Sequence, residues 1–160
     1  MSATTARPVR FAGRDFPRKR HVCAFFYSKA EEYRVLLPFV REGLEAGEKA
    51  FHVVDPALRS AHLDALRSAG IDVDQVSRTG QLEVKSWGEA YLRGGKFDQH
   101  SMLALIEEVL GKGGSGKRFP LVRLVANMEW ALEDFPGVDD LVEYETRLNY
   151  ILPKFDDPVI

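Results

Sequence analysis

One stretch of this sequence has the residue types and spacing of a phosphate-binding loop. Residues 111–118 fit the pattern G-x-x-x-x-G-K, in which backbone N–H groups and a lysine hold phosphates. Arg118, however, stands where a Ser or Thr hydroxyl would ligate magnesium. Such a loop must also leave a strand and open a helix, whereas the flanking patterns predict a helix before it and a strand after it. We therefore interpret residues 111–118 as an exposed helix-to-strand connector that does not bind a triphosphate.

A second group of polar and aromatic residues follows the predicted strands. Ligands of open parallel sheets bind in the crevice beyond the carboxyl ends of the strands. Aromatic walls with a few polar anchors are typical of small-molecule sites, so we predict a semi-apolar pocket for a small organic effector. Its candidate residues are Tyr27, Ser28, Asp55, Trp87, Asn127, Glu129 and Trp130. The alternative is that both tryptophans fill the core or face a partner and that Asp55 only caps the following helix.

Three residues are weak candidates for metal ligands. His21 and Cys23 are two positions apart on a predicted strand, so they face the same side, and His52 lies on a predicted neighbour. Three ligands without a fourth are an incomplete set for zinc, and the pair lies far from the predicted crevice. A buried cysteine and hydrogen-bonded histidines explain the pattern more simply. We therefore predict no metal and no other cofactor.

No spacing of residues singles out an enzymatic reaction. Catalysis of the common kinds needs a nucleophile beside a base, or two carboxylates whose environments differ. Pairs such as Glu129 with Asp55, or Glu133 with Asp134, are present only as composition. We therefore expect a protein without catalytic residues.

The elements that would position these side chains alternate along the chain. Short apolar runs predict strands over residues 21–27, 50–54, 82–87 and 121–128, and helical spacing recurs over 33–44, 58–66, 102–110 and 141–152. The first run is almost entirely apolar, which is typical of a strand covered on both faces of a sheet. Strands alternating with helices predict an α/β fold, a mainly parallel sheet flanked by helices. Residues 158–160 either open a further strand or finish the fold at a sheet edge.

Length and charge favour one domain with a distinct leading segment. The chain has 160 residues and a net charge of −2, so as a whole it has no electrostatic bias toward nucleic acid. Residues 1–20 hold six basic side chains against one acidic one, and we interpret them as a basic, flexible arm before a single domain over 21–160. One cysteine, no long apolar run and no signal-peptide pattern lead us to expect a cytoplasmic protein without a membrane span.

Two blocks of sequence resemble the MEDS domain, the sensory domain named after methanogens, methylotrophs and a dichloromethane-responsive regulator. The first block covers residues 21–27 and 37–49, and the second covers residues 123–130 with Tyr144, Glu145 and Asn149. The resemblance runs from about residue 20 to the end. It implies a divergent RecA/KaiC-like α/β fold without a functional phosphate-binding loop. The family pattern continues into a further strand after the last helix, so we expect the domain to be truncated at its C-terminus.

The resemblance also implies a function and partners. It predicts a non-catalytic sensory domain that binds a small, hydrocarbon-like effector and passes the signal to a kinase-like or DNA-binding module, with self-association expected by analogy. Two alternatives remain open. One is a nucleotide-dependent enzyme of the RecA/KaiC type. The other is an interaction module that binds protein or nucleic acid through the basic arm.

Overall fold

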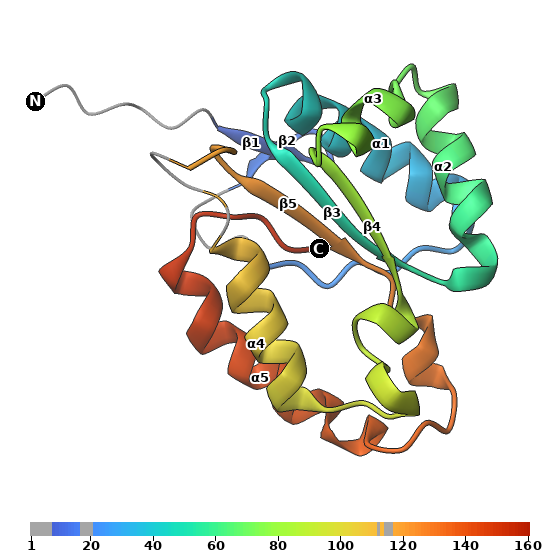
Figure 1. The fold of residues 1–160 in the computed structure, drawn as a ribbon, viewed down its shortest axis with the longest axis vertical. Helices are drawn as coiled ribbons and strands as arrows, with labels where there is room; N and C mark the ends of the chain where they lie inside the picture. The colour runs from blue at the N-terminus through green and yellow to red at the C-terminus, as the bar shows by residue number, and fades with distance from the viewer. Residues whose placement is uncertain (1–7, 17–20, 112, 114–116) are drawn as a thin grey trace, which may run out of the picture.

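A computed structural model describes residues 8–16, 21–111, 113 and 117–160. Its centre is a parallel three-stranded sheet in the order β4-β3-β5 (Figure 1), formed by β3 (Lys49–Val54), β4 (Leu82–Ser86) and β5 (Val122–Ala126). All six residues of β3 are buried, as a central strand covered on both faces requires. The three strands predicted over 50–54, 82–87 and 121–128 are confirmed.

Helices cover both faces of the sheet, which confirms the predicted α/β class. The helices α1 (Lys29–Glu45), α2 (Arg59–Ser68) and α3 (Val73–Arg78) lie on one face, and α4 (Gln99–Leu110) and α5 (Leu141–Ile151) lie on the other (Figure 1). Alternate residues of β3 separate the two cores: Ala50 packs toward α1 and α2, whereas Phe51 and Val53 pack toward α4 and α5. The order helix, loop, strand around residues 111–118 is confirmed, and residues 112 and 114–116 of that loop lie outside the described part.

The basic leading segment contains a small hairpin. Strands β1 (Val9–Phe11) and β2 (Arg14–Phe16) pair antiparallel, and Gly13 at the turn has a φ of 76°, which glycine adopts without steric cost. Val9 is buried, and the Phe11 ring meets Phe39 of α1 edge-on with centroids 5.7 Å apart. The sequence pattern predicts no element in this segment because the hairpin is short and its charged residues hide the alternation. Residues 1–7 and 17–20 lie outside the described part.

The prediction of a strand over residues 21–27 is wrong. This segment is extended, but it forms a single bridge at His21, and the side chains of Phe25 and Tyr27 are 90% and 101% exposed. Val22, Ala24 and Phe26 are half-buried while Cys23, Phe25 and Tyr27 are exposed, so only one face of the segment is covered.

The last residues of the given sequence lie between this segment and the sheet. Residues 158–160 lie parallel to β5, with bridges from Val159 to Leu124 on one side and to His21 on the other. The segment that begins at His21 is therefore one strand position away from β5, with residues 158–160 between the two. Of the two possibilities for residues 158–160, pairing at the sheet edge is the one observed.

Candidate functional site

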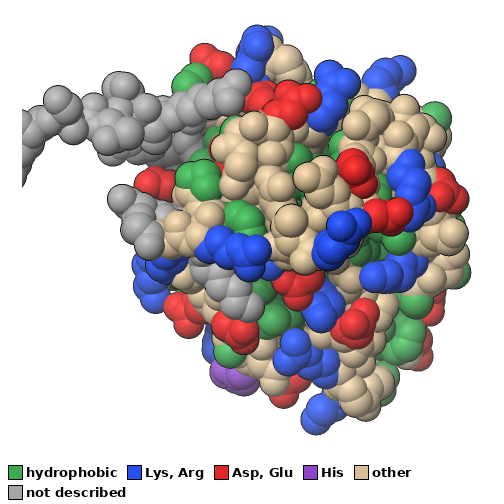
Figure 2. All heavy atoms as spheres, turned by 45° about the horizontal axis from the view of Figure 1, so that its top comes forward, with side chains coloured by type: hydrophobic (Ala, Val, Ile, Leu, Met, Phe, Trp, Pro, Cys, Tyr) green, Lys and Arg blue, Asp and Glu red, His purple; other side chains and the backbone are tan. Residues whose placement is uncertain are grey.

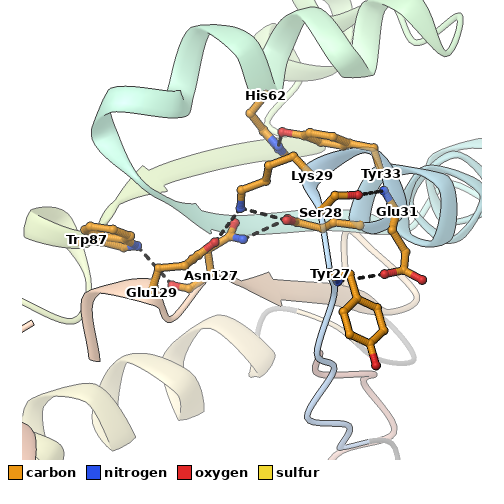
Figure 3. A network of polar contacts seen from close by, with 10 residues as sticks. Tyr27, Ser28, Lys29, Glu31, Tyr33, His62, Trp87, Asn127 and Glu129 are labelled. Atoms are coloured by element: carbon orange, nitrogen blue, oxygen red, sulfur yellow. Dashed lines mark hydrogen bonds and ion pairs between the residues drawn. The ribbon is translucent and has the colours of Figure 1, made fainter. Parts of the chain in front are cut away.

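Four side chains meet at the carboxyl end of the sheet, and we call them the Lys29 cluster: Lys29, Glu32, Asn127 and Glu129. The Lys29 ammonium donates to Glu32 Oε2 at 2.8 Å and to Glu129 Oε1 at 2.5 Å. The Asn127 amide donates to the other Glu32 oxygen at 2.9 Å. Figure 3 shows Lys29, from the start of α1, converging with Asn127 and Glu129, from the segment after β5. The cluster therefore joins the first helix to the last strand of the sheet.

Local structure holds each member of the cluster in place. Ser28 caps α1, because its hydroxyl accepts from the Glu31 backbone N–H at 3.2 Å, and this puts Lys29 and Glu32 on the first helical turn. Asn127 follows β5 and donates its backbone N–H to Val53 of β3 at 2.8 Å. Glu129 begins a single 3₁₀ turn, Glu129–Leu132. The positions of these side chains therefore depend on α1 and β5, two elements that the sequence pattern predicts.

The cluster carries one positive and two negative side chains. Burial alone would lower the pKa of Lys29, but its hydrogen bonds to Glu129 and Glu32 outweigh that effect and raise it. Glu32 is only 6% exposed, so its carboxylate depends on Lys29 and Asn127 for compensation. Such a fixed polar group can orient a ligand through hydrogen bonds at the edge of an otherwise apolar space.

A chain of aromatic polar groups extends from the cluster into the core between α1, α2 and β3. Tyr33 Oη lies 3.1 Å from His62 Nδ1, and His62 Nε2 lies 2.9 Å from His52 Nδ1. Each contact needs one hydrogen, so both imidazoles can be neutral and still make both contacts, while His52 Nε2 is buried and has no hydrogen-bond partner among the described residues. Burial lowers the pKa of His62 to about 4, and burial together with His62 lowers that of His52 further below its usual value. The two histidines are therefore uncharged at neutral pH.

Beside the Lys29 cluster lies a cavity of about 480 Å³, which we call the edge cavity. It occupies the gap between the extended segment 22–28 and the carboxyl end of β5, and all four members of the cluster line it. Apolar residues from α4 and α5 form the opposite wall, among them Ile106, Tyr144 and Leu148. The edge cavity therefore combines apolar walls with one polar rim.

The structure brings three of the seven predicted site residues to this cavity. Ser28, Asn127 and Glu129 line it, and Asn127 and Glu129 take part in the Lys29 cluster. Tyr27 contributes its backbone N–H, which donates to Glu31 at 2.8 Å, while its ring is fully exposed.

The other three predicted residues lie apart from the cavity. Asp55 accepts from the Ala57 backbone N–H at 2.8 Å and so caps the turn after β3. The Trp87 indole is buried and donates to the Asn127 carbonyl at 3.1 Å, so it helps to hold the backbone of one member of the Lys29 cluster in place. Trp130 is fully buried against Tyr91 and Phe97, with ring centroids 5.0 and 5.1 Å apart.

The three candidate metal ligands do not meet. His21 lies at the start of residues 21–28, which we call the edge segment, with its ring 3.5 Å from a Glu145 oxygen and 3.3 Å from the Asn149 amide oxygen. Cys23 is exposed, contrary to the buried cysteine that we expected, because the face of the segment that carries it is uncovered. His52 is buried on β3 beside His62. Within the described residues no group of three or more His, Cys, Asp or Glu side chains could hold a metal ion.

Sequence reasoning missed Lys29, Glu32 and the pair of His62 with Tyr33. Lys29 and Glu129 are 100 positions apart, so no local spacing joins them. One signal was present: the Ser28 cap fixes where α1 begins and hence puts Lys29 at the same end of the sheet as Asn127. His62 carried no such signal, because its partner His52 is identified only once α2 is docked on β3.

The fold and the edge cavity define a small α/β domain with a parallel sheet and one semi-apolar cavity beside it. Comparison with known proteins supplies the family: residues 20–158 match the model of the MEDS domain, the methanogen/methylotroph, DcmR sensory domain, and the chain belongs to that family. It is also 30% identical over 152 residues to the transcriptional repressor DcmR of Methylorubrum extorquens. That alignment covers 94% of this chain and 54% of the relative, so the chain spans about half the length of that protein. No solved structure matched.

These findings indicate a sensory or regulatory role. The family is a sensory one and the relative is a transcriptional repressor, which agrees with a non-enzymatic protein. None of the helices in the described part of the chain has the length and apolar character that a membrane-spanning segment needs.

Proposed function

We propose that this chain is a non-catalytic sensory domain that binds a small organic effector in the edge cavity and passes the signal to a regulatory partner or fused output module. The observation that carries the proposal is the cavity of about 480 Å³ with apolar walls and the Lys29 cluster at its rim. Pockets of this size and composition suit molecules of a few to about twenty heavy atoms. The sensory family and the repressor relative support the same role.

The proposal extends to the fold family, the compartment and the partner. We infer that the sheet has a RecA/KaiC-like origin. In this domain the loop between residues 21–27 and α1 no longer binds phosphates. We also place the domain in the cytoplasm, where a DNA-binding or kinase-like module would read the effector. A ligand changes such an output only through its different affinity for two states of the domain. The edge segment 21–28 is the element best placed to differ between them, because few backbone hydrogen bonds hold it.

A thermal-shift screen tests the proposal. Ketones, alcohols and haloalkanes of four to eight carbons would be added to the purified chain at millimolar concentration. A compound present at ten times its dissociation constant stabilises the folded state by about 1.4 kcal/mol, which raises Tm by about 3–6 °C in a domain of this size.

Two variants tie such a shift to the cavity. Ala24→Phe puts a ring into the edge cavity from the segment that lines it, whereas Ala30→Phe adds the same ring at an exposed position on α1. We expect the shift to vanish in the first variant and to persist in the second. Shifts that persist equally in both would show binding elsewhere, and the absence of any shift across the screen would end the proposal.

No observation favours the two alternatives over this function. The Lys117 ammonium, which a phosphate-binding loop would point at a nucleotide, donates to the Gly111 carbonyl within its own loop. On the face shown in Figure 2, basic and acidic side chains are interspersed and form no single-sign patch. Magnesium-dependent ATP binding that Lys117→Ala abolishes would revive the enzymatic alternative. A loss of partner affinity on deletion of residues 1–20 would revive the interaction module.

A further inference from the structure

His21 joins the start of the edge segment to α5 through both nitrogens of its ring. Its Nε2 lies 3.5 Å from Glu145 Oε2, and its Nδ1 lies 3.3 Å from Asn149 Oδ1. Because Glu145 and Asn149 are one helical turn apart, their side chains lie on the same face of α5. Each ring nitrogen of His21 therefore faces an oxygen atom of that helix.

The orientation of the Asn149 amide decides which form of the His21 ring fits. The amide nitrogen donates to the Glu145 carbonyl at 3.2 Å, which leaves Oδ1 as the atom that faces the ring. A neutral imidazole has one N–H and one lone pair, whereas the imidazolium has two N–H groups. A neutral ring that donates to Asn149 would turn its lone pair toward the Glu145 carboxylate. Only the imidazolium can donate to both oxygens, so the two contacts favour the charged ring.

The other groups around this contact do not compete with Glu145 for the ring. Burial raises the pKa of the Tyr91 and Tyr144 phenols, which lie near Glu145, so both stay neutral. Burial also raises the pKa of Glu145 itself, and the charge of His21 counteracts that effect. On its other side His21 bridges to Val159, whose side chain carries no charge. The Glu145 carboxylate is therefore the charge that the ring meets.

The edge segment is held at both ends, and His21 stands at the first of them. Next to the ring contacts, the Val22 N–H donates to the Val159 carbonyl at 2.9 Å. At the other end, the Tyr27 N–H donates to Glu31 at 2.8 Å. Residues 22–26 between these ends line the edge cavity. A change at the first end would therefore move one wall of the cavity.

We propose that His21 is a proton-controlled latch, in which the charged ring holds the edge segment against α5 and the neutral ring releases it. The latched state binds the proton more tightly than the released state, so the latch is closed at low pH and opens as the pH rises. Histidine in general loses its proton between pH 5 and 8, so the latch would respond to changes around neutral pH. A partly exposed ion pair of this kind changes a population about two- to fivefold.

The latch does not rest on the proposed effector, because all of its contacts lie within the chain. It would act on an effector all the same, because the segment that it holds lines the edge cavity. A compound in the cavity would then leave faster at high pH than at low pH.

Hydrogen exchange of the Val22 amide tests the latch. Exchange would be measured by NMR at pH 6.0 and pH 8.0 and divided by the intrinsic rate at each pH. We expect protection to be about two- to fivefold greater at pH 6.0. The Leu124 amide, which donates to the Pro158 carbonyl at 3.0 Å, reports changes of the whole domain and serves as the internal control. Equal protection of Val22 at both pH values after this correction, or no protection at either, would overturn the proposal.

Three variants tie the effect to the ion pair. Glu145→Gln removes the charge but keeps an oxygen, and His21→Gln removes the group that binds the proton, so both should abolish the pH dependence at Val22. Glu143→Gln is the matched control, because Glu143 is a carboxylate of the same helix that pairs with Arg147 instead. It should leave the pH dependence unchanged. A full pH dependence in Glu145→Gln, or its loss in Glu143→Gln, would count against the latch.

The ring of His21 gives a second measurement in the unmodified chain. Its ¹⁵N signals should show both nitrogens protonated at pH 6.0 and only one at pH 8.0. A ring that is already neutral at pH 6.0 would overturn the proposal, whatever the variants do. The latch and the effector can also fail separately. A pH-dependent Val22 amide with no bound compound in the screen would remove the effector alone, whereas bound compounds with a pH-independent Val22 amide would remove the latch alone.

Discussion

Mild acid should destabilise this domain through its two buried histidines. His62 and His52 are 7% and 1% exposed, and their rings contact each other at 2.9 Å. Burial lowers the pKa of His62 to about 4, against an ordinary value of about 6.5 in the unfolded chain. The folded state therefore binds fewer protons than the unfolded state between these two values, and stability falls as the pH drops through them.

The magnitude follows from the two pKa values of His62. At pH 7.5 the group is neutral in both states and has little effect. At pH 5 the unfolded state is almost fully protonated, so His62 alone removes about 2 kcal/mol of the free energy of unfolding. His52 acts in the same direction, because burial and then its neighbour His62 also lower its pKa. Glu145, whose pKa burial raises, acts in the opposite direction and reduces the total.

Urea unfolding at pH 7.5 and pH 5.0, followed by the fluorescence of the buried Trp87 and Trp130, measures this difference. We expect the wild-type chain to lose about 2 kcal/mol or more between the two values. The variant His62→Gln should be less stable at pH 7.5 but should lose clearly less on acidification. The exposed His100→Gln is the matched control and should behave like the wild type. Equal acid sensitivity in His62→Gln and the wild type would refute the reasoning.

Three further predictions concern single positions. Gly43→Ala should destabilise the domain by about 1–3 kcal/mol in urea unfolding, because the new Cβ would lie 2.5 Å from the buried Arg123 side chain, although alanine normally favours a helix. Lys29→Met should cost a similar 1–3 kcal/mol in the same assay, because it leaves the buried Glu32 carboxylate without its ion-pair partner. The thiol of Cys23, exposed at the edge cavity, should react with iodoacetamide in the folded protein, and a bound effector should slow that reaction severalfold.

The two stability predictions have matched control variants, and the Cys23 prediction has an outcome that would contradict it. Gly88→Ala adds a Cβ with nothing within 4 Å and should change stability little, so equal losses at both glycines would contradict the packing argument. Lys85→Met removes a lysine whose carboxylate partners, at 3.5 and 3.9 Å, are 33% and 52% exposed against 8% for Glu32, and a loss as large as that of Lys29→Met would contradict the role of burial. A Cys23 thiol that reacts only after unfolding would contradict the placement of the edge segment.

Hydrophobic pattern predicted the centre of the sheet because a central strand covered on both faces is apolar along its length. Ala50 to Val54 form a continuous apolar or aromatic run in the sequence, and the strand there is buried along its whole length. The same rule failed for His21 to Tyr27, where the apolar run is equally clear. A strand also needs a neighbour to pair with, and this segment pairs through His21 and Val22 with Val159, from the other end of the sequence. The apolar pattern indicates which residues prefer burial, whereas pairing depends on segments that are distant in the sequence.

The sequence predicted where the candidate site lies better than it predicted which residues form it. The rule that ligands bind at the carboxyl ends of parallel strands led to Ser28, Asn127 and Glu129, which line the edge cavity. It also led to Trp130, whose ring the structure places in the aromatic core beneath, because a residue near the end of a strand can point to either side of the sheet. Lys29 was missed because its role arises only when the first turn of α1 meets the segment after β5.

The most direct test of the sensory proposal is an amide chemical-shift map of the chain titrated with the small ketones, alcohols and haloalkanes of the screen. We predict saturable shifts at residues 22–29 and 124–129 and at the facing wall of Ile106, Tyr144 and Leu148, which together surround the edge cavity. The absence of saturable shifts with every compound, or shifts centred on the hairpin of residues 8–16, would contradict the proposal.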